Sequence, residues 1–287
     1  MAFPSFPAGT SSLVSKYLTT EIWDALKDAE DEVGFPFKKS INSAVVNKTV
    51  SMGVFAGSHN SYNAFALLMD PVIEAYHSHK PDAMHTTLMD PSKLVLPKFE
   101  DDELAMINST RIRVGRNLAG YPLGAAISRE QRLEIVNKLI TVFDQFEGNL
   151  QGKFYPLENM KKEYQHQLIA NHFLFKEGSK THEACGLNRD WPSGRGIFHN
   201  DAKTFLVWLN EEDHLRVISM ENGGDIYRVY ARLCNALKSM QGSLNFSYDD
   251  HHGYITSCPT NLGTAMRASV HIKLPKLSQD KVRNIIV

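Results

Sequence analysis

The chain changes its pattern of apolar residues near residue 100, and this change limits the folds that it can adopt. Before that point no strand-like alternation of polar and apolar residues occurs. Residues 11–30 and 70–80 instead carry apolar side chains at helical spacing, with serine and threonine available as N-caps. The first part is therefore predicted to be helical. A polar, proline-marked passage that starts at residue 85 is predicted to be a linker.

The second part mixes strand and helix patterns, which predicts an α+β fold. Three segments have the composition of strands, and the last two are predicted to form a hairpin: 107–116, 203–210 and 214–220. Two segments predict amphipathic helices. One is 128–148, where Ser128-x-x-Gln131 matches a capping box, and the other is 225–242.

Strict alternation at residues 266–274 predicts a strand whose two faces differ in chemistry. Its polar face would carry Arg267, Ser269, His271 and Lys273, and its apolar face would carry Ala268, Val270, Ile272 and Leu274. We expect the apolar face to lie in the core. A solvated polar side is the ordinary interpretation of the other face.

Arginines at matching strand positions suggest a second interpretation of that polar face. Arg111 and Arg113 are two residues apart on one predicted strand, and Arg216 lies on another. If these strands share a sheet with Arg267, the four guanidinium groups converge on one face and form a polyphosphate clamp. A solvated edge strand is the alternative. The chain has neither a G-x-x-x-x-G-K-[ST] loop nor a G-x-G-x-x-G turn, so the common glycine-loop phosphate sites are not expected.

Composition argues against several classes of partner. Lys and Arg total 31 and Asp and Glu total 32, so no excess of positive charge favours nucleic acid or an anionic membrane. Three scattered cysteines (Cys185, Cys234 and Cys258) and the polar start of the chain predict a reduced, cytoplasmic protein. No apolar run reaches the ~20 residues of a membrane-spanning helix.

Glu212 and Cys258 are candidates for chemistry at a cationic acceptor. Glu212 lies in the acidic turn of the predicted hairpin, where a carboxylate can orient a guanidinium group and accept its proton. A solvated turn residue is the simpler interpretation. Cys258 is either an inert buried thiol or, with Ser257, Thr260 and arginines nearby, a thiolate that pairs with a cation.

Six motifs occur in a recognisable order along the second part: STRIRVGR, HFLFKEG, WPSGRGIFHND, NEEDHLR, CPTNLGT (258–264) and RASVHIKLP. They resemble the motifs of the ATP:guanido phosphotransferases, or phosphagen kinases, and most closely those of arginine kinases. The resemblance implies a small all-α domain (1–84), a linker (85–105) and a larger nucleotide-binding domain (106–287) in which helices flank an antiparallel β-sheet. It also implies reversible transfer of the ATP γ-phosphoryl group to a guanidino nitrogen.

The resemblance also implies roles for individual residues. Glu212, Arg216 and Cys258 match catalytic positions. The nucleotide-binding positions are Ser109, Thr110, Arg111, Ile112, Arg113, His172, Arg216, Arg267, Ala268, Ser269, Val270 and His271. The acceptor-binding positions are Ser51, Met52, Gly53, Val54 and Phe55, with Glu212 and Cys258. Mg²⁺ would be held through the ATP or ADP phosphates and water, and no protein metal ligand is expected.

Two departures from the family pattern leave alternatives open. Arginine-specific members carry a Ser-Gly-Val-Gly-x-Tyr loop, whereas this chain has SMGVF with Phe55 at the tyrosine position. L-Arginine is the expected acceptor, with taurocyamine and lombricine as alternatives. Family members also continue past the LPKL segment into a loop with a second glutamate, a further arginine and a closing helix.

Residues 280–287 predict an amphipathic helix that is cut off, so we expect the C-terminal part to be missing and turnover to be reduced. A truncated, non-catalytic product that binds nucleotide or a partner protein is the alternative function. The sequence is compatible with a monomer or a dimer.

Overall fold

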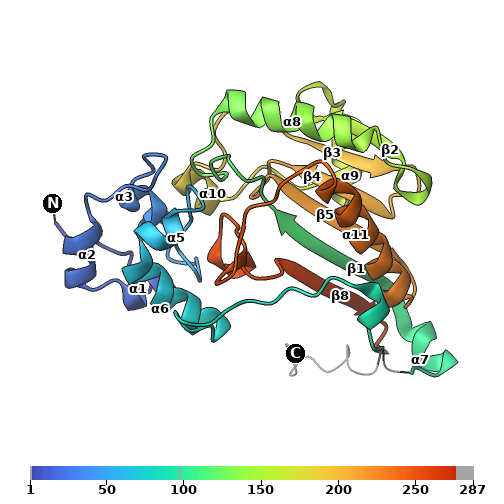
Figure 1. Cartoon of the computed structure of the whole chain (residues 1–287), viewed down its shortest axis with the longest axis horizontal. Helices are drawn as coiled ribbons and strands as arrows, with labels where there is room; N and C mark the ends of the chain where they lie inside the picture. Colours follow the sequence, from blue (N-terminus) through green and yellow to red (C-terminus); the bar gives the residue numbers. More distant parts are fainter. Residues whose placement is uncertain (1, 97, 276–287) are drawn as a thin grey trace.

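The computed structural model describes residues 2–96 and 98–275, so the predicted helix at 280–287 lies outside the described residues. The first part is helical, as predicted, and its helices gather at one end of the molecule (Figure 1). Ser12 and Thr19 accept hydrogen bonds from the backbone amides of Ser15 and Ile22, so each caps a short helix. The helices are α1 (Leu13–Tyr17), α2 (Thr20–Leu26), α3 (Phe37–Ser40), α4 (Asn42–Val46), α5 (Ser61–Ala64) and α6 (Ala66–His77).

The segment after α6 leads from the helical part to the sheet part, where it reaches α7 and the first strand (Figure 1). The range predicted as a linker, 85–105, contains the 3-10 turn η1 (Pro91–Lys93) and most of helix α7 (Asp101–Met106). Acidic residues in the first turn of α7 and a Glu100–Glu103 capping box explain this helix, which the sequence analysis did not predict. The domain boundaries themselves stay a prediction.

A six-stranded antiparallel sheet forms the centre of the second part, in the order β2-β3-β4-β5-β1-β8. The three predicted strands are confirmed as β1, β4 and β5, and β4 and β5 pair as the predicted hairpin. The sequence analysis did not predict β2 and β3. The strands are β1 (Ile107–Arg116), β2 (Gly152–Pro156), β3 (Gly196–Asn200), β4 (Phe205–Leu209), β5 (Leu215–Asn222) and β8 (Met266–Ile272), and β6 (Tyr248–Asp249) and β7 (Gly253–Tyr254) form a separate hairpin.

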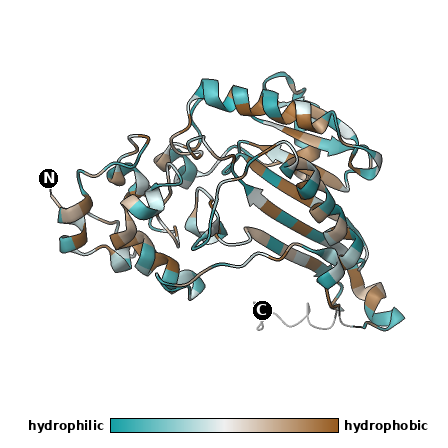
Figure 2. Ribbon diagram, in the orientation of Figure 1, coloured by the Kyte–Doolittle hydropathy of each residue, from teal (hydrophilic) through white to brown (hydrophobic). Residues whose placement is uncertain are grey.

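Two long helices, α8 (Arg129–Phe143) and α11 (Ile226–Gln241), cover one face of this sheet. Apolar side chains that alternate along the strands, such as Val114, Val207 and Val217, pack there against Leu139 and Leu233. Alternating bands of brown and teal along the strands in Figure 2 follow this division. Helix α8 opens with the predicted Ser128 capping box but ends at residue 143, five residues before the predicted end.

The opposite face is divided between an apolar layer and an open region. Over β3, β4 and β5, Leu168 of α9 (Lys162–Ala170) and Phe175 pack against Ile197, Trp208 and Ile218. The apolar layer ends at Trp208 of β4, which lies opposite Arg216 of β5. From there toward β1 and β8 the same face carries arginines. Short elements complete the second part: η2 (Gly148–Leu150), η3 (Leu157–Asn159), α10 (Lys180–Cys185) and η4 (Pro259–Asn261).

The helical part and the sheet part share one apolar cluster. Side chains of α1 to α6 pack with Leu123, Leu187 and Ile255 from the second part. The backbone amide of Ala56 also donates to the carbonyl oxygen of Ser257 at 2.8 Å. The segment before residue 57 is thereby held beside the CPTNLGT motif.

The prediction that one face of residues 266–274 lies in the core is wrong. Val270, Ile272 and Leu274 are 37, 46 and 41% exposed, and Ala268 is exposed as well. The cause is position, because β8 is the outermost strand and pairs only with β1 among the described strands. Within residues 2–96 and 98–275, no helix is long and apolar enough to span a bilayer.

Candidate active site

Arginines from three neighbouring strands share one face of the sheet. Arg113 of β1 lies opposite Arg267 of β8, and Gly115 of β1 lies opposite Arg216 of β5. Arg111 has the same orientation as Arg113, because alternate residues of a strand point to the same face. The expectation that the four arginines belong to one sheet face is confirmed.

A pocket of about 610 Å³ opens over this arginine face. Arg113, Arg216 and Arg267 line one wall, and Glu212 and Asn261 line another. The end of α6 contributes Tyr76 and His77, so the helical part closes one side. The pocket therefore brings three cations and one carboxylate from distant parts of the chain into a single cavity.

The charges of this pocket are arranged to receive an anion. Burial, followed by the charges of Arg216, Arg111 and Arg267, lowers the pKa of Arg113 to about 10. Burial, followed by the charges of Arg216 and Arg267, also lowers the pKa of Arg111. The guanidinium carbons of Arg111 and Arg216 lie 5.7 and 5.8 Å from the ring centre of Trp208, which holds both groups by cation–π contacts. A bound polyanion would offset this accumulation of positive charge.

Glu212, which lines the pocket, is held by three neighbours. Its Oε1 accepts a hydrogen bond from Asn261 Nδ2 at 2.7 Å and lies 4.0 Å from Arg216 Nη2. Its Oε2 lies 3.3 Å from Nε2 of His182, a residue of α10. Burial alone would raise the pKa of Glu212, but the hydrogen bond with His182 and the charge of Arg216 bring it below its ordinary value. Glu212 is therefore an ionised carboxylate in a cationic surrounding.

Asp213, the last residue of the acidic turn, fixes the turn by hydrogen bonds to two other segments. Its Oδ1 accepts hydrogen bonds from Asn117 Nδ2 at 2.8 Å and from the backbone amide of Ser257 at 2.7 Å. Ser257 Oγ donates in turn to the carbonyl oxygen of Glu212 at 2.8 Å. Burial, followed by the charge of Glu212, raises the pKa of Asp213 to about 6. Asp213 thus ties the end of β1, the acidic turn and the CPTNLGT motif together.

Cys258 is a buried thiol and not the thiolate that the sequence analysis considered. Burial, followed by the charge of Glu212, raises the pKa of the thiol far above its ordinary value. Thr260 Oγ1 donates to Sγ at 3.2 Å, and the side chain packs in the cluster shared by the two parts. It does not line the arginine pocket.

Residues 52–55 of the loop lie in the helical core whereas Ser51 is exposed, and the loop does not line that pocket. Met52, Val54 and Phe55 are buried, and Gly53 adopts a φ of +90°. A β-carbon on Gly53 would lie 2.7 Å from Cβ of Ala44, so this position requires glycine. The Phe55 ring meets the His182 ring edge-on, with centres 6.1 Å apart. His182 thus contacts both this loop, through Phe55, and Glu212.

The other predicted nucleotide-binding positions are divided between the two faces of the sheet. Thr110 and Ile112 are buried on the helix-covered side, and Thr110 Oγ1 donates to the carbonyl oxygen of Gly223. Ser109 and His271 lie on the arginine side, with Oγ and Nδ1 3.0 Å apart. Ala268, Ser269 and Val270 are exposed, like the rest of β8, and His172 is exposed after α9; none of these four lines the pocket.

Sequence reasoning missed several residues that shape the site. Asn261 lies inside a recognised motif, and Asp213 follows Glu212 directly, so both had a positional signal. Asn117 and His182 had none, because their contacts with Asp213 and Glu212 join residues 96 and 30 positions apart in the chain.

The fold and pocket define a two-part protein with an arginine-rich pocket beside a buried carboxylate. Two family models match: the N-terminal domain of ATP:guanido phosphotransferase over residues 8–74, and its C-terminal catalytic domain over residues 134–287. The chain therefore belongs to the ATP:guanido phosphotransferase family.

Similar proteins are longer than this chain. An arginine kinase of Anthopleura japonica is 49% identical over 93% of the chain, which spans 37% of that protein. An arginine kinase of Artemia franciscana is 47% identical over 95% of the chain, which spans 76% of that protein. The duplicated taurocyamine kinase of Schistosoma mansoni superposes with a TM-score of 0.87 at 37% identity, covering 95% of this chain and 39% of that one. A lombricine kinase superposes with a TM-score of 0.89 at 35% identity, covering 98% and 78%.

Proposed function

We propose that this protein is a phosphagen kinase that transfers the γ-phosphoryl group of MgATP reversibly to the guanidino group of a small acceptor, with L-arginine as the preferred one. The observation that carries the proposal is the convergence of Arg113, Arg216 and Arg267 with the ionised Glu212 in one pocket. Family membership and the arginine kinase relatives support the reaction class. The SMGVF loop keeps taurocyamine and lombricine as alternative acceptors.

The pocket residues divide the work of the reaction between donor and acceptor. The arginines would hold the phosphate oxygens of the nucleotide through guanidinium forks and offset the charge that develops during transfer. Mg²⁺ would enter bound to the nucleotide phosphates. Asp213, Asn117 and Ser257 would fix the acidic turn, so that Glu212 meets the acceptor in a constant orientation.

Glu212 would bind the guanidinium group of the acceptor and receive its proton. The bond between the γ-phosphorus and the bridging oxygen breaks, ADP leaves with the electron pair, and a phosphorus–nitrogen bond forms. Arg216 lies 3.1 Å from Glu211 and also lies beside Glu212, and it lines the pocket with Arg113 and Arg267. It would therefore be able to contact both the nucleotide phosphates and the acceptor. Cys258, as a protonated thiol next to the acidic turn, would contribute shape and not charge to the acceptor side.

The test is an ADP-release assay on residues 1–287 with MgATP and arginine, taurocyamine, lombricine or creatine, each beside the Arg267→Ala variant. We expect turnover with arginine that the variant loses. Turnover with another acceptor would reassign the substrate. A folded protein that binds MgADP but releases no ADP with any acceptor would instead identify a binding protein without catalysis, the second candidate function.

A further inference from the structure

A histidine pairs with one oxygen of the Glu212 carboxylate. His182 Nε2 lies 3.3 Å from Oε2 of Glu212, while Asn261 Nδ2 donates to Oε1. Both carboxylate oxygens therefore have partners within the protein. A guanidinium group that binds Glu212 has to share or replace one of these contacts.

The position of His182 is fixed by the docking of α10 on α4. Thr181, which precedes His182, accepts at its carbonyl oxygen from Ser43 Oγ (3.0 Å) and at Oγ1 from Asn47 Nδ2 (2.9 Å). Asn42 Nδ2 donates to the carbonyl oxygen of Ala184 at 2.8 Å. These bonds join α10 to the helical part, whereas Glu212 belongs to the β4–β5 turn of the sheet part.

The charges that face His182 come from the acidic turn, β5 and neighbouring helices. Glu212 and Glu211 are negative and Arg216 is positive. On its own helix, Cys185 is neutral, since burial raises the pKa of that thiol to about 11. Lys39 of α3 is a further cation near this helix, and its side chain lies against Gly186, the residue after Cys185. Burial alone would lower the pKa of His182, but the hydrogen bond and the charge of Glu212 raise it above its ordinary value.

We propose that the imidazolium of His182 takes the place of the acceptor cation on Glu212 and leaves when a guanidinium group binds. The identity of that cation rests on the proposed function, whereas the His182–Glu212 pair does not. A guanidinium group keeps its charge at physiological pH, so two cations compete for one carboxylate. The balanced step is exchange: the protonated site takes up one guanidinium cation and releases one proton to solvent.

The exchange predicts that the KM of the acceptor depends on pH and that the KM of the nucleotide does not. As pH falls below the pKa of His182, the acceptor KM should rise, approaching tenfold per pH unit, while the nucleotide KM changes little. In the His182→Gln variant, which keeps a neutral hydrogen-bonding side chain, the acceptor KM should vary little over the same range. His166→Gln, at an exposed position of α9, is the matched control and should keep the wild-type slope. Equal slopes in wild type and His182→Gln would overturn the proposal.

A second readout needs no catalysis and separates failure of this inference from failure of the proposed function. The imidazole resonance of His182 is identified in NMR spectra by its loss in His182→Gln and followed through a pH titration of the ligand-free protein. The pKa of His182 should fall in Glu212→Gln, and it should fall in the wild type when millimolar arginine is added, relative to lysine at the same ionic strength. A pKa that neither change lowers would overturn the proposal even if the protein is an active kinase. If both changes lower it in a protein without turnover, the proposal stands and the kinase function fails.

Discussion

Arg113 of β1 and Arg267 of β8 lie directly opposite each other in neighbouring strands. Like charges at opposed positions destabilise a sheet, and Arg216 adds a third cation to the same pocket. Arg267 is exposed on the outermost strand, so water screens part of this repulsion. A polyphosphate bound between them would remove this repulsion, which is the basis of the first prediction.

The first prediction concerns Arg267→Ala. Because one of two opposed charges is removed, the ligand-free protein should lose no stability and gain up to about 1 kcal/mol in free energy of unfolding. The MgADP dissociation constant should rise by about tenfold or more, since a bidentate phosphate contact is lost. Thermal unfolding with and without MgADP measures both effects. Arg228→Ala is the control, because its exposed ion pairs with Glu221 and Asp225 are remote from the pocket, and nucleotide affinity should not change.

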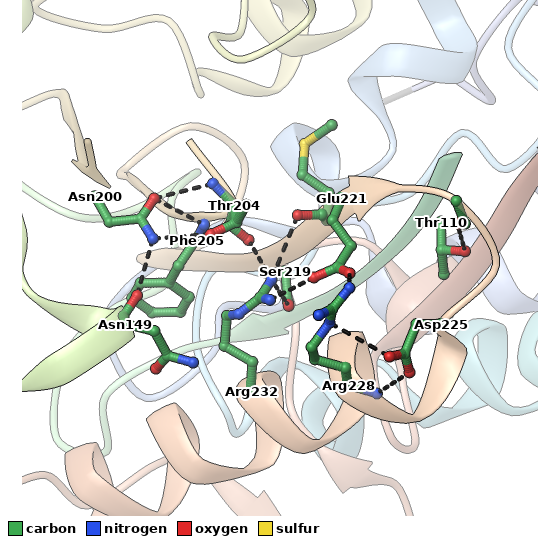
Figure 3. A network of polar contacts seen from close by, with 12 residues as sticks. Thr110, Asn149, Asn200, Thr204, Phe205, Ser219, Glu221, Asp225, Arg228 and Arg232 are labelled. Carbon is green, nitrogen blue, oxygen red and sulfur yellow. Dashed lines mark hydrogen bonds and ion pairs between the residues drawn. The ribbon is translucent and has the colours of Figure 1, made fainter. Parts of the chain in front are cut away.

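The second prediction concerns a buried ion pair that supports the sheet. Glu221 at the end of β5 accepts from Arg232 of α11 at 2.5 Å and also pairs with Arg228 (Figure 3). Arg232 is 6% exposed, so Glu221→Ala leaves a buried cation without its carboxylate and should cost about 3–5 kcal/mol. Denaturant unfolding would measure this cost. Glu134→Ala, which removes an exposed pair with Lys138, should cost less than about 1 kcal/mol, and equal losses would contradict the interpretation.

The third prediction concerns Asp213 and pH. Its pKa of about 6 in the folded protein exceeds the ordinary 3.8, so the folded state binds the proton more tightly than the unfolded chain. The resulting stabilisation is present below about pH 4 and is lost as pH rises through about 6. Relative to Asp213→Asn, the wild type should lose up to about 3 kcal/mol across this interval. Unfolding free energies of the two proteins that stay parallel from pH 4 to pH 7 would refute the shift.

The fourth prediction concerns the start of α8. Ser128 Oγ accepts from the backbone amide of Gln131, and the Gln131 side chain accepts from the backbone amide of Ser128. Ser128→Ala should therefore lower the free energy of unfolding by about 1 kcal/mol without changing the acceptor KM. Thr141→Ala, at an exposed position of the same helix, should be neutral or slightly stabilising. A similar loss in both variants would argue against the capping box.

The sequence predicted the elements whose signals are local. The capping box at Ser128 and the alternation in 107–116 depend on neighbouring residues, so α8 and β1 could be located without tertiary information. The face of β8 was assigned wrongly, because alternation reports two different faces but not whether another element covers one of them. Strand order decides that question, and it is set by long-range pairing.

The candidate site was predicted in the same uneven way. The four arginines were identified from their strand positions together with the family motifs. The pairing of His182 with Glu212 depends on how α10 docks against α4, and the burial that keeps Cys258 protonated depends on packing between the two parts. Neither has a signal in the spacing of residues along the chain.

The central claim is that the arginine pocket transfers phosphate from MgATP to a guanidino nitrogen. The most direct measurement is ³¹P NMR of MgATP and L-arginine incubated with residues 1–287. A resonance of a nitrogen-bound phosphoryl group should appear as the γ-phosphate signal declines, and it should be absent with Arg267→Ala. If no such resonance appears with any guanidino acceptor while MgADP still raises the unfolding temperature, the pocket binds nucleotide without catalysing transfer, and the claim is contradicted.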